Sequence, residues 1–329
     1  MYVLEGNRQW LGWDHKRWLW AVAGVVAYGL LPLILDQYWL HVSIMILFYV
    51  MMASSWNLLA GYTGQISLAH AAFAGVGAYT SGILAVKYGV PPLIGLPLGV
   101  IMAALLGLGL GLLCIRMGGI YLTLTTLAFS EIIRLVINNE YEITRGTMGL
   151  KVPVLFGTYS KVTSFYVMMA AALLVVFVIR KILYSDLGMS FRAVQNDETA
   201  AASVGLPVFK VRIAAFVITA AMAGMAGSLY GHYLLLITPH IPSLDMMFLV
   251  LAMAVIGGLG TFVGPILGAV FLETLAEQIR VWGEFHVLIY GLIALAVVRF
   301  APLGVVGSLN ERFSTGAVGA PRVAKESTS

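Results

Sequence analysis

Charged residues are scarce in this sequence. Only 10% of its 329 residues are Asp, Glu, Lys or Arg, whereas a soluble domain carries about 25%. Hydrophobic residues make up 60% of the chain, and the mean hydropathy is +0.93. A soluble domain of this length could not cover so much apolar surface. The composition therefore excludes a soluble enzyme, a secreted disulfide scaffold and a disordered chain, and it predicts a polytopic membrane protein.

Residues that support chemistry are also few. The single cysteine, Cys114, excludes an intramolecular disulfide. The sequence has no Gly-x-x-x-x-Gly-Lys-Ser/Thr phosphate loop, no Gly-x-Ser-x-Gly elbow and no His-Glu-x-x-His pair. His232 and His240 lack the spacing to carboxylates that a metal site needs. We therefore expect no catalytic residue, no metal and no ATP bound by this chain, and the net charge of +4 is too small to suggest nucleic acid.

Long runs without charge indicate membrane-spanning helices. The run 37–86, for example, contains no Asp, Glu, Lys or Arg. A spanning helix needs about 20 residues, whereas membrane strands are about 10 residues long and alternate polar with apolar side chains. The sequence therefore predicts an all-α helical bundle with about ten transmembrane helices. The predicted spans are 18–35, 38–60, 65–86, 92–115, 118–138, 162–181, 212–235, 244–259, 262–279 and 284–300.

The distribution of basic residues predicts the orientation. If the N-terminus is cytoplasmic, thirteen of the 19 Lys and Arg residues fall on the inside and six on the outside, as the positive-inside rule requires. The predicted organisation is a cytoplasmic N-terminus (1–17), a transmembrane domain (18–305) and a disordered cytoplasmic tail (306–329). Both termini are then cytoplasmic.

One long polar segment, 182–211, lies on the predicted cytoplasmic side. Its alanine-rich part, 192–204, favours a helix of about four turns, which Gly205 and Pro207 would end. Two interpretations stand at this point. The helix could lie on the membrane surface as an amphipathic element, or it could dock a cytoplasmic partner through its small alanines and rim charges. The candidate docking residues are Arg192, Asp197, Glu198, Ala201 and Gly205.

Several motifs together resemble a known family. The segment 198–205 (ETAAASVG) is similar to the EAA…G pattern in the coupling loop of ABC-importer permeases, with Thr199 in place of the first alanine and the glycine one position later. The remaining blocks, in order and spacing over roughly residues 40–305, resemble branched-chain amino acid permeases of the LivM type. These blocks are 61–79 (GYTGQISLAHAAFAGVGAY), 121–129 (YLTLTTLAF), 147–150 (TMGL), 223–230 (AGMAGSLY), 255–268 (VIGGLGTFVGPILG) and 299–304 (RFAPLG).

The resemblance implies a type II-like ABC-importer permease in the bacterial inner membrane. Such a subunit is expected to pair with a second related permease, two cytoplasmic ATPases that bind ATP and Mg²⁺, and a periplasmic substrate-binding protein. The implied substrates are branched-chain or related hydrophobic amino acids, with urea, short amides or aromatic acids as alternatives. An ion-coupled secondary transporter and a membrane-embedded enzyme are alternatives of a different class, but the sequence lacks a chain of buried carboxylates or a reactive constellation for them.

Polar residues at membrane depth are candidates for the substrate pathway. A helix broken near Gly61–Gly64 could offer backbone donors to the carboxylate of an amino acid. The alternative is that the Ser and Thr hydroxyls bond back to their own helices, and that His70 is a packed, hydrogen-bonded histidine. The candidate pathway residues are Gly61, Gly64, Gln65, Ser67, His70, Thr123 and Thr126.

Glycines and a few intramembrane charges complete the predictions. Gly260, Gly264 and Gly268 are spaced by four, which predicts one glycine face for close helix packing in lipid. Glu131 and Arg134 are three residues apart and can form an ion pair on one helix.

Overall fold

The computed structural model describes residues 15–114, 117–157 and 159–279. Helices dominate this part of the chain, and two short strands pair antiparallel, with Leu150 opposite Ile237. The elements are α2 (His15–Gly29), η1 (Leu31–Leu33), α3 (Gln37–Thr63), α4 (His70–Lys87), α5 (Pro92–Leu113), α6 (Gly119–Asn139), α7 (Tyr141–Thr144), η2 (Gly146–Met148), β1 (Leu150–Lys151), α8 (Lys161–Leu183), α9 (Asp186–Asn196), α10 (Glu198–Ser203), α11 (Val208–Leu234), β2 (Leu236–Ile237), α12 (Leu244–Gly257) and α13 (Gly264–Ile279).

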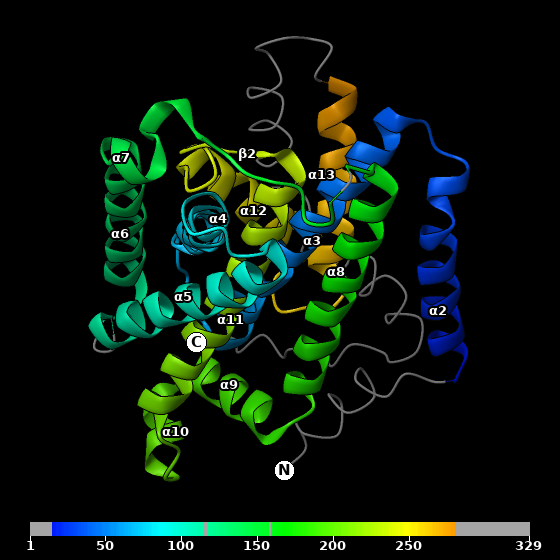
Figure 1. The fold of residues 1–329 in the computed structure, drawn as a ribbon. Helices are drawn as coiled ribbons and strands as arrows, with labels where there is room; N and C mark the ends of the chain where they lie inside the picture. The colour runs from blue at the N-terminus through cyan, green and yellow to red at the C-terminus, as the bar shows by residue number, and fades with distance from the viewer. Residues whose placement is uncertain (1–14, 115–116, 158, 280–329) are drawn as a thin grey trace, which may run out of the picture.

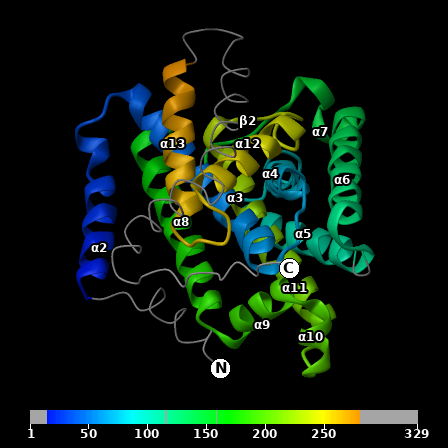
Figure 2. The same ribbon diagram turned by 180° about the vertical axis from the view of Figure 1, so that it is seen from behind.

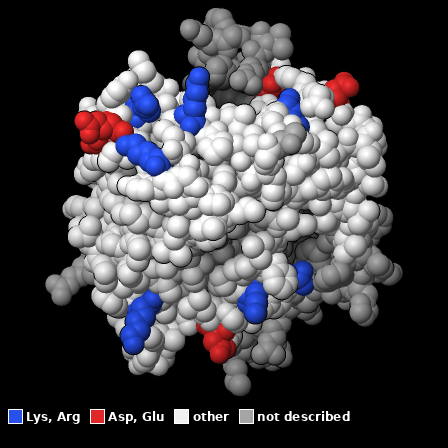
Figure 3. Space-filling view, viewed as in Figure 1, with Lys and Arg blue, Asp and Glu red and all other residues white. Residues whose placement is uncertain are grey.

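The molecule has two polar ends with an apolar band between them. The two strands and α7 lie at one end, and α9 and α10 lie at the other (Figures 1 and 2). On the face shown in Figure 3, the charged side chains gather at these two ends and leave the band between them uncharged. Five described helices, α3, α5, α6, α8 and α11, are long and apolar enough to cross a membrane.

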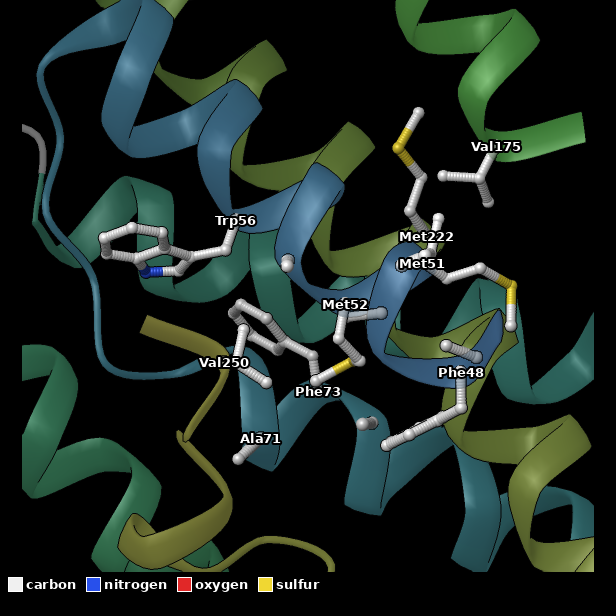
Figure 4. Close-up of a cluster of buried hydrophobic side chains, with 14 of the residues drawn as sticks. Phe48, Met51, Met52, Trp56, Ala71, Phe73, Val175, Met222 and Val250 are labelled. Carbon is white, nitrogen blue, oxygen red and sulfur yellow. The ribbon is translucent and has the colours of Figure 1, made fainter. Parts of the chain in front are cut away.

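Helix α3 forms the centre of the bundle. Nearly all of its residues are buried, because α4, α8, α11, α12 and α13 all pack against it or against its neighbours. Large apolar side chains from five of these helices meet in one core (Figure 4). The indole N–H of Trp56 donates to the Ser67 carbonyl at 2.7 Å, which ties this core to the linker that follows α3. The labelled residues of the core are Phe48, Met51, Met52, Trp56, Ala71, Phe73, Val175, Met222 and Val250.

Helix α11 crosses α4 and α5 at very close range. A Cβ added at Gly77 of α4 would lie 2.2 Å from the Gly224 carbonyl oxygen, and one at Gly227 would lie 2.0 Å from the Ala74 carbonyl oxygen. Real Cβ atoms do not approach backbone so closely, so these positions require glycine. Close backbone approach of this kind stabilises helix pairs in lipid through van der Waals contact.

Nine of the ten predicted spans coincide with a helix, and the tenth, 284–300, lies outside the described residues, as do the tail 306–329 and most of segment 1–17. One start differs: the span predicted from residue 65 begins at His70. Gly64 ends α3 in the left-handed conformation (φ 71°), which favours glycine. Residues 65–69 then form a linker that is buried except for Ile66.

The predicted span 244–259 is also corrected. Helix α12 has 14 residues, about 21 Å at 1.5 Å per residue, which is shorter than a bilayer core of about 30 Å. It ends at the predicted glycine break, and α13 returns toward the end of the molecule from which α12 came (Figures 1 and 2). The two helices form a hairpin whose loop, 258–263, packs against α3 through Gly260 and leaves Leu259 and Val263 exposed.

Candidate functional site

The predicted docking helix is two helices rather than one. Helix α9 ends at Asn196, and α10 begins at Glu198. Asp197 lies between them in extended conformation, and its carboxylate accepts hydrogen bonds from the backbone N–H groups of Thr199 (2.8 Å) and Ala200 (3.0 Å). The prediction of one continuous helix over 192–204 is therefore wrong. Asp197, expected as a rim charge, serves as the N-cap of α10, a position that Asp strongly favours.

The apolar face of α9 is covered by the protein itself. Phe191 and Val194 are fully buried, and α9 packs against α3, α8 and α11. Gly188 allows this packing, because a Cβ there would lie 2.4 Å from the Ile182 carbonyl oxygen. Most of the apolar face of α9 is thus occupied, although Met189 is 63% exposed, and this packing argues against the membrane-surface interpretation.

Helix α10 projects from the molecule and carries two of the five candidate docking residues, Glu198 and Ala201. Ala201 packs inward, whereas the side chain of Glu198 is 51% exposed. The turn after α10 is open: Val204 is 78% exposed, and nothing lies within 4 Å of a Cβ built at Gly205. Gly205 has φ 85°, which allows the chain to turn from α10 into α11.

Helix α9 lies directly against the end of α3. The side-chain amide of Gln195 donates to the Gly61 carbonyl at 2.8 Å, and the Arg192 guanidinium lies over the Tyr62 ring, 5.6 Å from its centroid. Gly64 is in van der Waals reach of Gln195. The first two candidate pathway residues, Gly61 and Gly64, are thus placed beside the candidate docking segment.

Arg212, in the first turns of α11, is the functional candidate that sequence reasoning missed. It is 7% exposed, and its three guanidinium nitrogens donate to Gln65, Glu198 and the Met117 carbonyl. A signal was present in the sequence: Arg212 is the last charge before the uncharged run 213–244 and follows the polar segment directly. Its partners lie far away in sequence, and only the fold brings them together.

The remaining candidate pathway residues also gather in space. The Thr126 hydroxyl accepts a hydrogen bond from the Leu68 N–H at 2.9 Å, and the Thr123 hydroxyl donates to the Ile66 carbonyl at 3.0 Å. Both threonines therefore hold the linker 65–69 against α6. Ser67 is also fully buried and accepts from the Ala69 N–H. The two threonine hydroxyls also donate to carbonyls of their own helix, Thr123 to Gly119 and Thr126 to Thr123, which is the alternative considered for them.

His70, at the start of α4, is fully buried. The expected packed histidine is present, and the Ser55 backbone is the polar group that interacts with its ring, although neither ring nitrogen makes a well-aligned hydrogen bond among the described residues. Its ring makes an edge contact with Phe73, with centroids 5.9 Å apart.

The three predicted packing glycines do not share one helix face. Helix α13 begins at Gly264, and Gly260 lies in the preceding loop with φ 70°. Gly268 packs α13 on α12, since a Cβ there would lie 1.9 Å from the Met253 carbonyl oxygen. Gly260 instead packs on α3: a Cβ at Gly61 would lie 2.5 Å from its nitrogen. The prediction failed for Gly260 because the glycine cluster ends a helix before the spacing by four can continue.

No group of three His, Cys, Asp or Glu side chains that could hold a metal ion occurs within the described ranges. Glu131 and Arg134 form the predicted ion pair at 2.5 Å, with about a third of each side chain exposed.

Comparison with known proteins gives one family. Residues 38–298 match the model of the family described as "branched-chain amino acid transport system / permease component". The chain is 30% identical to the high-affinity branched-chain amino acid transport system permease protein LivM of Escherichia coli K12, over 88% of this chain and 75% of that protein. It is 26% identical to the probable LivM of Methanocaldococcus jannaschii, over 65% and 70%, and 25% identical to LivH of E. coli K12, over 79% and 91%. No solved structure matches the chain.

Proposed function

Because this chain belongs to the permease family of branched-chain amino acid transport systems, we propose that it moves branched-chain or related hydrophobic amino acids into the cytoplasm by alternating access. Members of the family are membrane transport subunits rather than enzymes, and ATP binds to separate ATPase subunits. The observation that carries the proposal is the projecting α10 beside a packed α9, because an ATP-driven importer needs one exposed element that ATPases can move.

The proposed assembly has this chain, a second related permease, two cytoplasmic ATPases and a periplasmic binding protein. Similarity to both LivM and LivH supports a pair of related permeases, since both are named as permeases of such a system in E. coli K12. The proposed location is a bacterial inner membrane with both termini cytoplasmic. Helix α2 begins toward the α9–α10 end of the molecule (Figures 1 and 2), which agrees with an N-terminus on the ATPase side.

The turn after α10 is the proposed contact for an ATPase subunit. Ala200, Ala202 and Val204 are exposed there, and small apolar residues on a projecting helix suit insertion into a groove. The large exposure of Val204 and the open space beside Gly205 support this role, because both leave room for a partner at the turn.

The proposal is tested with Val204→Asp in the complex co-expressed from the neighbouring transport genes. Co-purification of the ATPases should fall by about tenfold, the effect of about 1.4 kcal/mol at a contact, because a carboxylate would be desolvated in the groove. The matched control is Met148→Asp, which places the same charge on a hydrophobe that is 71% exposed at the opposite end. Normal ATPase binding by Val204→Asp would overturn the docking role.

Uptake by the reconstituted complex tests the transport function. Proteoliposomes that hold the complex should accumulate radiolabelled leucine only under two conditions. ATP must be present in the lumen, on the side of the ATPases, and the binding protein must be present outside. Uptake driven by an ion gradient without ATP would support the secondary-transporter alternative. Binding of urea, a short amide or an aromatic acid in place of leucine by the partner binding protein would replace the proposed substrate class.

A further inference from the structure

We propose that Arg212 is the positioning residue that transmits movement of α10 to the helices of the transport path. This inference rests on the proposed function, since it assumes that ATPases move α10. Arg212 lies on α11, and its guanidinium joins three other segments: α10, the linker between α3 and α4, and the connection between α5 and α6.

Each guanidinium nitrogen of Arg212 contacts a different segment. Nη1 lies 3.2 Å from a carboxylate oxygen of Glu198 on α10. Nε donates to the side-chain oxygen of Gln65 at 3.3 Å, and Nη2 donates to the Met117 carbonyl at 2.5 Å. Arginine suits this position because its planar fork holds several donors in fixed directions. A single lysine nitrogen could reach Glu198 or the other two acceptors, but it could not hold the same arrangement.

The two charged side chains differ in exposure, and this difference determines how Arg212 responds when α10 moves. The Arg212 side chain is 8% exposed, whereas that of Glu198 is 51% exposed. Separating such a pair would leave a buried charge uncompensated, which is strongly unfavourable. A displacement of α10 by a bound ATPase is therefore expected to pull Arg212 along rather than break the pair.

The other contacts of Arg212 lead to the helices around the linker. Gln65 also donates to the Thr63 hydroxyl at 2.8 Å, at the end of α3. The linker that Gln65 begins is bonded to α6 through Thr123 and Thr126, and Met117 lies just before the start of α6. Movement of Arg212 thus acts on the first half of α6 from two directions. A coupling element must shift the balance between the inward-open and outward-open states of the pore. Otherwise ATP binding would not change the side from which the substrate pathway is open.

The test compares Arg212→Lys, Glu198→Gln and the double variant in the complete complex with both permeases, the ATPases and the binding protein. Leucine uptake and ATP hydrolysis are measured in the same proteoliposomes. Uptake per ATP should fall by about tenfold in each single variant, within the range of about 5- to 150-fold for coupled sites. The double variant should lose no more than the worse single variant, because both residues act as one unit. Lys210→Gln is the control, since Lys210 is an exposed cation on the same turn of α11.

Three outcomes are distinguishable. Assembled complexes of both single variants with uptake per ATP within about twofold of wild type would overturn the role of Arg212, and so would losses that multiply in the double variant. If Arg212→Lys does not assemble, the Glu198→Gln variant alone tests the proposal. It should assemble, because the Glu198 side chain is half exposed and is not part of the buried core. Failure of the proposed function would look different: the wild-type complex itself would show no ATP-dependent uptake.

Discussion

At the scale of single residues, Asn57 connects the centre of the bundle to the α12–α13 hairpin. Its side-chain oxygen accepts from the Gly260 N–H, and its side-chain nitrogen donates to the Thr261 carbonyl, both at 2.9 Å. The side chain is 3% exposed. The partly buried loop would otherwise leave these two backbone groups without a protein partner, and a single amide satisfies one donor and one acceptor there.

Replacing Asn57 should therefore destabilise the hairpin. Asn57→Ala would remove the two part-buried hydrogen bonds to the Gly260 N–H and the Thr261 carbonyl, at a cost of about 0.5–1.5 kcal/mol for each bond. We expect a lower midpoint of thermal unfolding for the purified complex and faster hydrogen exchange over residues 258–263. Ser54→Ala is the matched control one turn earlier on α3, because the Ser54 hydroxyl has no hydrogen-bond partner in the described part of the chain. Equal stability of the two variants would contradict the role of Asn57.

The sequence predicted which residue types would gather, but not which of them would pair. Thr123, Thr126 and Ser67 were candidates for one substrate pathway, and the fold brings the two threonines to the linker that holds Ser67. Asn57 and Arg212 were missed because each bonds to a residue far away in the sequence. Gly260 lies 203 residues from Asn57, and Gln65 lies 147 residues from Arg212. Periodicity and spacing report only on neighbours along the chain, so such contacts need the tertiary structure.

At the scale of elements, the break between α9 and α10 shows how capping overrides helix propensity. The alanines after Glu198 favour a helix, and continuity from Arg192 was a reasonable expectation. The side chain of Asp197, however, bonds to the N–H groups that begin a new helix. Asp and Asn compete with helix continuation through such local hydrogen bonds. The break lets α9 pack inside the molecule while α10 projects from it (Figure 1).

Removing this cap should loosen α10 alone. Asp197→Ala is expected to cost about 1 kcal/mol of helix stability. Since 1.4 kcal/mol corresponds to a factor of ten, the fraction of molecules in which α10 is locally unfolded should rise by about fivefold. Hydrogen–deuterium exchange of the peptide that covers residues 198–204 should show this change, while residues of α9 keep their protection. Asp197→Ser keeps a side-chain acceptor and should restore most of the protection. Equal exchange in the Ala and Ser variants would show that the cap does not hold α10.

At the scale of the whole molecule, the α12–α13 hairpin leaves the prediction of sidedness unchanged. Helix α12 is too short to cross a bilayer and returns through α13 to the same end. The chain returns to its starting side whether 244–259 and 262–279 are two full spans or one hairpin. The C-terminus is therefore expected on the same side in both cases. Hydropathy detects apolar length and cannot tell a short hairpin from two spans. The fold class was predicted because apolar length alone determines it.

The orientation itself can be measured with single cysteines at the two ends. Val204 and Met148 are 78% and 71% exposed, near α10 and near β1, and the native Cys114 is buried at 1% exposure. Cys114 should therefore react little, so each new cysteine is read against a low background. A membrane-impermeant maleimide should label Val204→Cys in inside-out vesicles and Met148→Cys in right-side-out vesicles. The reverse pattern would place α10 outside the cell, beyond the reach of any cytoplasmic ATPase, and would end the importer proposal together with its coupling route.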